Sequence, residues 1–560
     1  MKYLPTFNLL FYVVALGLLL WLVLYPNLHI LSQSFEKDGQ VGLVNYLEFF
    51  HNPSQLEALI NSLILSLGSV GFSAVIGVPL AFIFHRYEFP GRTIFAALAT
   101  LPVLLPPLVG VISFMFLYGE SGIITRFIQI LLRLSSAPFS LRGIWAILFI
   151  HAYTMYAYFY LFVTAGLKRM DFSLQEAARS LGASRLRVFF AVTLPMLTPS
   201  LMGASLLTFM TSMASFSAPY LFGGGTRVLA LQIYNSKLNG DLAMAYVETV
   251  ILSLSSILFL ILLQRYEGTA RYRSLSKGDL RPAREARRRT IRFLMSTLGA
   301  GLVLFLLLPH LVLILISFSK DGTWTTEILP PQYTLSNYAQ LFSDPHFLEP
   351  IRNSLEMSGM ATALNFLFAM VVGYLLANRQ IPGRTLLNAL VLLPWALPGT
   401  VLALSLASTF NQAQPLRGKL LLVGTFWLLP LAYFIRNIPL VVRPVQASFE
   451  QLDPALAEAG QSLGGSWLYV FRRVTLPMVL PGALAGSMLA FVTALGEFVS
   501  SIVIYTINNR PISIEILAQL RQFNFGSAAA YGVLLILLMA AVFFVSHNYF
   551  SQADRSSVPY

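Results

Sequence analysis

Residue types that catalyse reactions or hold metal ions are sparse in this sequence, and they are not grouped. The 560 residues include no cysteine, which excludes disulfides, thiolate metal sites and redox dithiols. The seven histidines are scattered without metal-ligand spacing. No GxxxxGK[ST] phosphate loop occurs, and the nearest fragment, Arg417-Gly418-Lys419-Leu420, lacks the hydroxyl and the upstream glycine. We therefore expect no enzyme activity, no metal and no cofactor bound by this chain, so any ATP is used by a partner.

Two polar stretches of one design are more informative. The first is Glu176-Ala177-Ala178-Arg179-Ser180-Leu181-Gly182, and the second is Glu458-Ala459-Gly460-Gln461-Ser462-Leu463-Gly464. Apolar residues recur at steps of four, three and four from Met170 to Leu181, and again from Leu452 to Leu463. This spacing places them on one face of an α-helix. Each glycine suits a left-handed helix cap. Leu-Pro at Pro195 and Pro477 then opens the next helix, because proline is tolerated in a first turn.

A short helix with a narrow apolar stripe between two apolar segments is suited to docking in a partner's groove. The alternative is an interfacial helix that lies on lipid. Two copies with matching spacing favour docking, because a motor of two subunits needs two attachment points.

The elements that hold these stretches are predicted from composition. Only 11% of the residues are charged and 56% are hydrophobic, whereas soluble proteins carry about 25% charged residues. A charge at the bilayer centre costs about 2.5–3.5 kcal/mol on insertion scales, so a low charge content indicates membrane helices. We predict an all-α polytopic membrane protein with twelve spans, near residues 8–31, 57–84, 94–118, 143–167, 196–221, 243–264, 293–318, 352–377, 385–409, 420–441, 478–505 and 530–550.

The basic residues concentrate in loops between these spans. Residues 265–292 hold ten Lys/Arg against three acids, which predicts a cytoplasmic linker by the positive-inside rule. An even number of spans on either side then places both termini in the cytoplasm. The loop 119–142 fits less well, since it is predicted outside yet carries Arg126, Arg133 and Arg142. We interpret the net charge of +13 as this loop bias and not as a nucleic-acid site.

The two halves of the chain repeat one another. Asn45-Tyr46 recurs as Asn337-Tyr338 and Pro90-Gly91-Arg92-Thr93 as Pro382-Gly383-Arg384-Thr385, at an offset of 292. Thr193-Leu194-Pro195 recurs as Thr475-Leu476-Pro477 at an offset of 282, so the first half has ten extra residues before it. We predict two six-span units at 1–264 and 293–560, joined by 265–292 and related by a pseudo-twofold axis along the membrane normal.

The duplicated motif resembles a known family. Glu-Ala-Ala, three residues, Gly, nine residues, an aliphatic (Val192 or Val474), one residue and Leu-Pro is similar to the motif of permeases of binding-protein-dependent ABC importers; Gly460 departs where alanine is usual. The resemblance implies a multi-pass permease of the bacterial inner membrane that works with two copies of a cytoplasmic ATP-binding subunit and a periplasmic or lipid-anchored solute-binding protein. It also implies coupling residues: Glu176, Ala177, Ala178, Leu181, Gly182, Pro195, Glu458, Ala459, Gly460, Leu463, Gly464 and Pro477.

Polar residues inside spans are candidates for the translocation pathway, because they are costly in lipid. Glu497 is the first candidate, and a carboxylate that is paired for packing or lies near the external end of the span is an equal alternative. Its repeat partner is Ser215, and Thr211 and Ser212 lie on the same span. His151 and the tyrosines of the fourth span fit a packed seam better than a binding site. Prolines in the third span of each half are expected to kink it: Pro102, Pro106, Pro394 and Pro398.

The sequence specifies the transported solute less well than it specifies the class of transporter. Two fused halves resemble ferric-iron permeases first, and thiamine, polyamine and phosphonate permeases next. The main rival from another class is a proton-coupled secondary transporter with twelve spans, which also has parallel six-span repeats. Such a carrier has no need of a duplicated docking helix. A membrane-embedded enzyme lacks any supporting cluster of residues.

Overall fold

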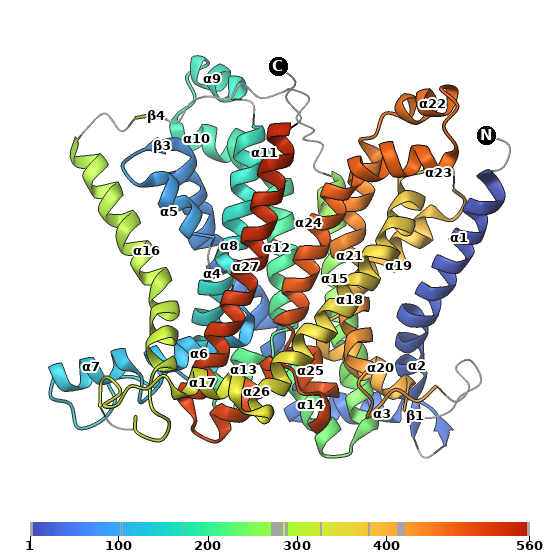
Figure 1. Cartoon of the computed structure of the whole chain (residues 1–560). Coiled ribbons are helices and arrows are strands. Elements are labelled where there is room, and N and C mark those ends of the chain that lie inside the picture. Colours follow the sequence, from blue (N-terminus) through green and yellow to red (C-terminus); the bar gives the residue numbers. More distant parts are fainter. Residues whose placement is uncertain are drawn as a thin grey trace.

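The computed structural model describes the chain except residues 1–3, 38, 101, 103–104, 171, 270–283, 286–288, 325–326, 379–380, 412–419 and 557–560. The described residues are almost entirely helical (Figure 1). The strands among them have two residues each: β1 Glu36–Lys37 pairs with β2 Gln40–Val41, and β3 Tyr87–Glu88 with β4 Arg284–Glu285. Within the described residues ten helices are long and apolar enough to cross a membrane, or up to twelve if each bent pair is one span. The prediction of an all-α polytopic membrane protein is confirmed.

The first half contains six membrane segments in the predicted order. They are α1 Leu4–Leu19 with the π-helical turn η1 Leu20–Leu24 and α2 Tyr25–Ser34; α4 Pro53–Arg86; α5 Arg92–Leu98 with α6 Pro107–Tyr118; α8 Gly143–Arg169; α12 Thr198–Met213 with α13 Ser217–Phe222; and α15 Leu242–Thr269.

The second half has the same order. Its segments are α16 Arg289–Ser317; α18 Pro345–Ala377; α19 Arg384–Ala396 with α20 Gly399–Thr409; α21 Leu428–Glu450; α24 Leu476–Leu495 with α25 Val499–Ile504; and α27 Phe525–Ser556. Most of the predicted linker 265–292 lies outside the described residues, although α15 and α16 extend into its two ends.

Several predicted spans are broken or displaced. The third span of the second half bends by 108° between α19 and α20, where Pro398 is the N-cap of α20. In the first half Pro106 is the N-cap of α6, so the kinks expected at Pro106 and Pro398 are breaks between helices, whereas Pro394 lies within α19. The predicted span 420–441 was wrong in position, because the helix begins at Leu428 and continues through Pro439 and Pro444 to Glu450. Apolar content alone did not locate this start.

Short helices cover the two ends of the bundle. One end carries α9 Ser173–Ser180, α10 Arg185–Val188, α22 Pro454–Ser462 and α23 Trp467–Val470, and here α1 begins and α27 ends (Figure 1). We name this end the α9/α22 face. The opposite end, the α14/α26 face, carries α3 Val44–His51, α7 Ile123–Leu131, α14 Leu229–Leu238, α17 Ser336–Ser343, η5 Ile507–Asn509 and α26 Ile512–Arg521.

Small side chains let the long helices pack closely. A buried row of small residues runs along α4, which packs against α8, α12 and α14: Ala58, Ser62, Ser66, Ser69, Ser73, Gly77 and Ala81. A Cβ at Gly77 would lie 2.4 Å from the carbonyl oxygen of Tyr156, and one at Gly373 on α18 would lie 2.6 Å from Val445 Cγ1 on α21. Glycine is therefore required where these backbones meet, as is usual in membrane bundles.

The first helix of each half packs on the other half. The segment α1–α2 contacts α18 and α20, and α16 contacts α5 and α6 (Figure 1). The two cores, α4–α8–α12 and α18–α21–α24, are thus held together by crossed N-terminal helices.

Candidate functional site

The duplicated polar stretches form two exposed helices on one face of the bundle. Helix α9 and helix α22 project from the α9/α22 face (Figure 1). Their equivalent leucines, Leu181 and Leu463, are each 89% exposed, and Glu176 and Glu458 are exposed as well. A large apolar side chain that is almost fully exposed at the same place in two repeats marks a surface for a partner.

Both helices end in the predicted way. The backbone φ is +83° at Gly182 and +86° at Gly464, so each glycine takes the left-handed conformation. The N–H of Ala183 donates to the carbonyl of Ala178, and the N–H of Gly465 donates to the carbonyl of Gly460. These bonds, with those from each glycine N–H to the residue three before it, complete the same Schellman cap twice.

The segments that follow are also alike. Ser184 and Ser466 cap α10 and α23 through bonds of 3.3 Å to the backbone N–H three residues on. A π-helical turn follows each, η3 Phe189–Thr193 and η4 Phe471–Thr475. Pro195 and Pro477 then occupy the first turns of α11 Leu194–Met196 and α24, as predicted. The two stretches therefore have the same local structure from cap to span.

The departure at Gly460 has a packing reason. A Cβ at this position would lie 3.0 Å from Val470 Cγ2, on the helix that follows. The equivalent residue in the first half, Ala178, is partly buried in the same place. Glycine lets α22 pack slightly closer to α23, and the general form of the stretch is kept.

Two equivalent phenylalanines meet at the centre of the molecule. Phe216 follows the break between α12 and α13, and Phe498 follows the break between α24 and α25. Their rings pack edge to face with centroids 5.8 Å apart, and both side chains are buried. Because they are partners in the repeat, their contact lies where the two halves face one another.

Glu497, the first pathway candidate, is paired. Its Oε2 lies 2.9 Å from Nε of Arg436, and its Oε1 accepts the Ser500 N–H at 2.8 Å. Its side chain is only 7% exposed. Of the two alternatives considered from sequence, the geometry agrees with a carboxylate held in a packed ion pair. Arg436 was missed, although an arginine within the predicted span 420–441 was a sufficient signal.

The other candidates surround His151. Its Nδ1 lies 2.8 Å from Ser69 Oγ and 3.2 Å from Ser212 Oγ, and its Nε2 lies 2.8 Å from Ser215 Oγ. The hydroxyl of Thr211 donates to the carbonyl of Leu207 on its own helix. Ser215 and Ser212 are thus joined in one network, and Thr211 lies outside it.

The tyrosines of the fourth span are packing residues. The hydroxyls of Tyr153, Tyr156 and Tyr160 donate to the carbonyls of Leu306, Ala99 and Ala96. These bonds fasten α8 to α16 and α5. The interpretation as a packed seam is confirmed.

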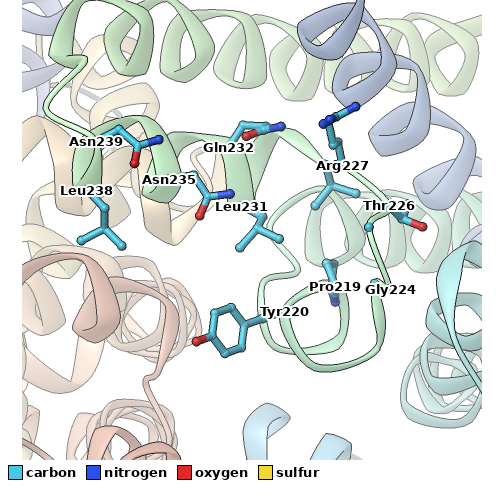
Figure 2. A pocket seen from close by; sticks show the side chains of 13 residues that line it. Pro219, Tyr220, Gly224, Thr226, Arg227, Leu231, Gln232, Asn235, Leu238 and Asn239 are labelled. Carbon is cyan, nitrogen blue, oxygen red and sulfur yellow. The ribbon is translucent and has the colours of Figure 1, made fainter. Parts of the chain in front are cut away.

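A pocket opens on the α14/α26 face beside the central phenylalanines. Its volume is about 420 Å³, and α13, α14 and the turn between them line it (Figure 2). Tyr220, one turn after Phe216 on α13, stacks on that ring at 5.6 Å. This pocket was not predicted from the sequence, because the lining side chains are common polar residues in a loop and a short helix.

Comparisons with known proteins agree with the motif. The model of the family "Binding-protein-dependent transport system inner membrane component" matches residues 73–271 and 369–553. A probable ABC transporter permease of Sinorhizobium fredii is 29% identical over 95% of this chain and 94% of its own length. The ferric transport system permease FbpB of Actinobacillus pleuropneumoniae is 28% identical over 94% of this chain and 76% of its own. The sulfate permease CysT of Salmonella typhimurium is 32% identical over 40% of this chain and 85% of its own.

One family match falls in each half, and together the two matches cover more than half of the sequence. The chain therefore belongs to the binding-protein-dependent transport system inner membrane components, the permease subunits of ABC importers.

Proposed function

We propose that two ATP-binding subunits dock on α9 and α22 and drive this permease to import a solute handed over by a solute-binding protein. The observation that carries the proposal is the pair of identically capped helices whose Leu181 and Leu463 are each 89% exposed. On this reading the α9/α22 face is cytoplasmic and the α14/α26 face receives the solute. Glu176, Ala177 and Gly182, with their counterparts Glu458, Ala459 and Gly464, form the docking surfaces.

The proposed pathway runs between the halves, past Ser215 and Glu497. The ring pair Phe216–Phe498 blocks it in the present conformation, and rotation of the halves separates the rings. Ser212 belongs to the network that holds His151 beside this path. Thr211 bonds to its own helix and is the weaker candidate.

For the cargo we propose ferric iron. The support is the ferric permease FbpB, which aligns with 94% of this chain, both halves included, whereas the sulfate permease CysT aligns with 40%. Sulfate is the second candidate, since identity to CysT reaches 32% within the aligned part.

The test combines Glu176→Lys with Glu458→Lys in the full transporter, reconstituted with its ATP-binding subunits and solute-binding protein. We expect the variant to insert normally, to lose its ATP-binding subunits on purification and to import no iron. Glu349→Lys, an exposed charge reversal on α18 at the α14/α26 face, is the matched control and should retain those subunits. Full retention of the ATP-binding subunits by the double variant contradicts the docking proposal. ATP-driven uptake of sulfate in place of iron contradicts the cargo.

A further inference from the structure

The pocket beside Phe216 contains a backbone turn of unusual shape. Between α13 and α14 the chain runs Gly223-Gly224-Gly225-Thr226, and all four residues line the pocket. Gly223 is in the right-handed helical region, whereas φ is +54° at Gly224 and +98° at Gly225. The Thr226 N–H closes the turn on the Gly223 carbonyl at 2.9 Å. A right-handed residue followed by a left-handed one points successive N–H groups to the same side and makes a concave anion site.

The amides of this turn are available. Neither the Gly224 N–H nor the Gly225 N–H meets an acceptor in the described part of the chain. Unpaired backbone donors that face a cavity are suited to bind an oxygen-bearing ligand. In the second half the equivalent turn is closed on itself, because Thr506 and Asn509 form a capping box and the Thr506 N–H donates to Asn509 Oδ1. Of the two equivalent turns, both of which the structure describes, the one in the first half is open.

The opposite wall supplies further donors. Gln232, Asn235 and Asn239 follow at helical spacing on α14 and line the pocket with the ring of Tyr220 (Figure 2). Each amide carries an NH₂ group, and the phenol carries an O–H. Burial raises the pKa of the neighbouring Tyr234 phenol, against the opposing influence of the Arg521 guanidinium.

Positive charge adjoins these donors. Arg521, at the end of α26, donates to the hydroxyl of Tyr220 and lies 5.5 Å from the centroid of its ring. Lys237 on α14 donates to the carbonyl of Val503 on α25. Neither cation has a carboxylate within ion-pair distance among the described residues, in contrast to Arg227, which is paired with Glu57 at 2.8 Å. The described residues that line the pocket include no acidic side chain.

We propose that this pocket binds a small oxyanion, held by the Gly224–Gly225 amides, the α14 amide side chains and Arg521 through Tyr220. The proposal rests on the proposed function and names the chemistry of the solute that enters on this face. The oxyanion is either the solute itself or the oxygen ligand that accompanies ferric iron. A bare cation finds no ligand of opposite charge here, and Glu497 deeper in the path is already paired.

The position of the pocket suits an entry site. Tyr220 connects it to Phe216, whose ring meets Phe498 at the centre. A solute released on the α14/α26 face can therefore reach the pocket before the ring pair separates.

Equilibrium binding tests the proposal without ATP or the solute-binding protein. The full permease with its ATP-binding subunits is placed in lipid nanodiscs, and binding of radiolabelled sulfate, phosphate and ferric citrate is measured. We expect one of these probes to bind, and the double variant R521Q/N235A to raise its Kd at least tenfold. R521K should restore part of the affinity for the probe, because lysine keeps the positive charge of Arg521 but lacks its planar guanidinium fork.

The matched control is R352Q. Arg352 lies near the start of α18, the end that belongs to the α14/α26 face. Its side chain is 74% exposed, and it forms an ion pair with Glu356. Its removal should leave the Kd unchanged. Binding of sulfate or phosphate alone identifies a free oxyanion, and binding of ferric citrate alone identifies an iron escort; both support the site.

The proposal is overturned if none of the three probes binds to the wild-type transporter, or if R521Q/N235A binds as tightly as R352Q. The assay does not depend on α9 or α22. If the oxyanion proposal is wrong, the docking proposal still stands. If the docking proposal is wrong, the oxyanion proposal still stands.

Discussion

The two halves of this permease are alike in their scaffold and different in the polar residues beside the central Phe216–Phe498 pair. Asn45 Nδ2 donates to the carbonyls of Ser34 and Glu36, and Asn337 Nδ2 donates to those of Ser317 and Ser319. The same repetition appears in other pairs of equivalent bonds. Asn61 and Asn353 donate to the Arg227 and Arg510 carbonyls, Ser62 and Ser354 accept the Leu229 and Ile512 N–H groups, and Arg92 and Arg384 donate to the Phe84 and Leu376 carbonyls.

At the centre the chemistry diverges. The first half holds Ser215 against His151, and the second half holds Glu497 against Arg436 at the equivalent helix break. The pocket turn diverges too, being open at Gly224–Gly225 and self-capped at Thr506–Asn509. Bonds that fix helix ends and the caps of α9 and α22 are thus duplicated, and so are the central phenylalanines, whereas the polar groups beside those rings are not.

Among the duplicated residues, substitution of the exposed leucines is expected to cause the largest loss of transport. We expect Leu181→Asp or Leu463→Asp alone to lower ATP-driven transport by about tenfold to a hundredfold. A carboxylate buried in an interface without a partner costs on the order of 2–3 kcal/mol, and the loss of one attachment point stops the concerted motion.

The measurement is uptake into proteoliposomes, with retention of the ATP-binding subunits as the second readout. Equal losses in the two variants support equivalent docking. A severe loss in one variant and none in the other breaks the equivalence.

At the divergent centre, we predict that Glu497 and its equivalent Ser215 contribute unequally to the stability of the permease. Removing one member of a buried ion pair leaves the other charge unpaired, so Glu497→Gln should lower the free energy of unfolding by about 3 kcal/mol. Ser215→Ala removes a neutral hydrogen bond and should cost about 1 kcal/mol.

Thermal unfolding of the purified permease in one detergent measures both changes. Arg436→Gln combined with Glu497→Gln should be less harmful than Glu497→Gln alone, because no charge is left behind. If Ser215→Ala proves as damaging as Glu497→Gln, the asymmetry proposed for the centre is wrong.

The scaffold asparagines should give closely matched effects. Asn45→Ala and Asn337→Ala each leave two backbone carbonyls without a donor, which should cost about 1–3 kcal/mol in either half. Hydrogen exchange at α3 and α17, which begin beside these residues, reports the local loss. The two losses of stability should agree within about 0.5 kcal/mol. A larger difference would show that equivalent hydrogen bonds in the two halves do not contribute equally to stability.

Much of this organisation could be predicted from the sequence. Low charge content and long apolar runs predicted the bundle. The repeated Glu-Ala and Leu-Pro residues predicted two equivalent capped helices, since glycine and proline positions dictate local backbone whatever surrounds them.

The rest could not be predicted for physical reasons. The break of 108° between α19 and α20 depends on which proline ends the helix, and Pro394 lies within α19 whereas Pro398 begins α20. The partners of Glu497 and His151 come from other helices, and no spacing along the chain records them. The open turn at Gly224–Gly225 required backbone angles, which a run of three glycines permits without specifying.

The smallest predicted effect concerns the one difference between the docking helices. Gly460→Ala should lower stability by about 1 kcal/mol or less, because the added Cβ lies 3.0 Å from Val470 Cγ2 and the valine must shift slightly. Val470→Ala in the same chain should relieve the contact and abolish the difference between glycine and alanine at 460. Ala178→Gly, the reciprocal change, should cost a similar amount through backbone entropy. Chemical denaturation of the purified permease compares the variants. If Gly460→Ala stabilises the permease instead, then Val470 has room to move, and glycine at this position reflects the ATP-binding partner and not the packing of α22 on α23.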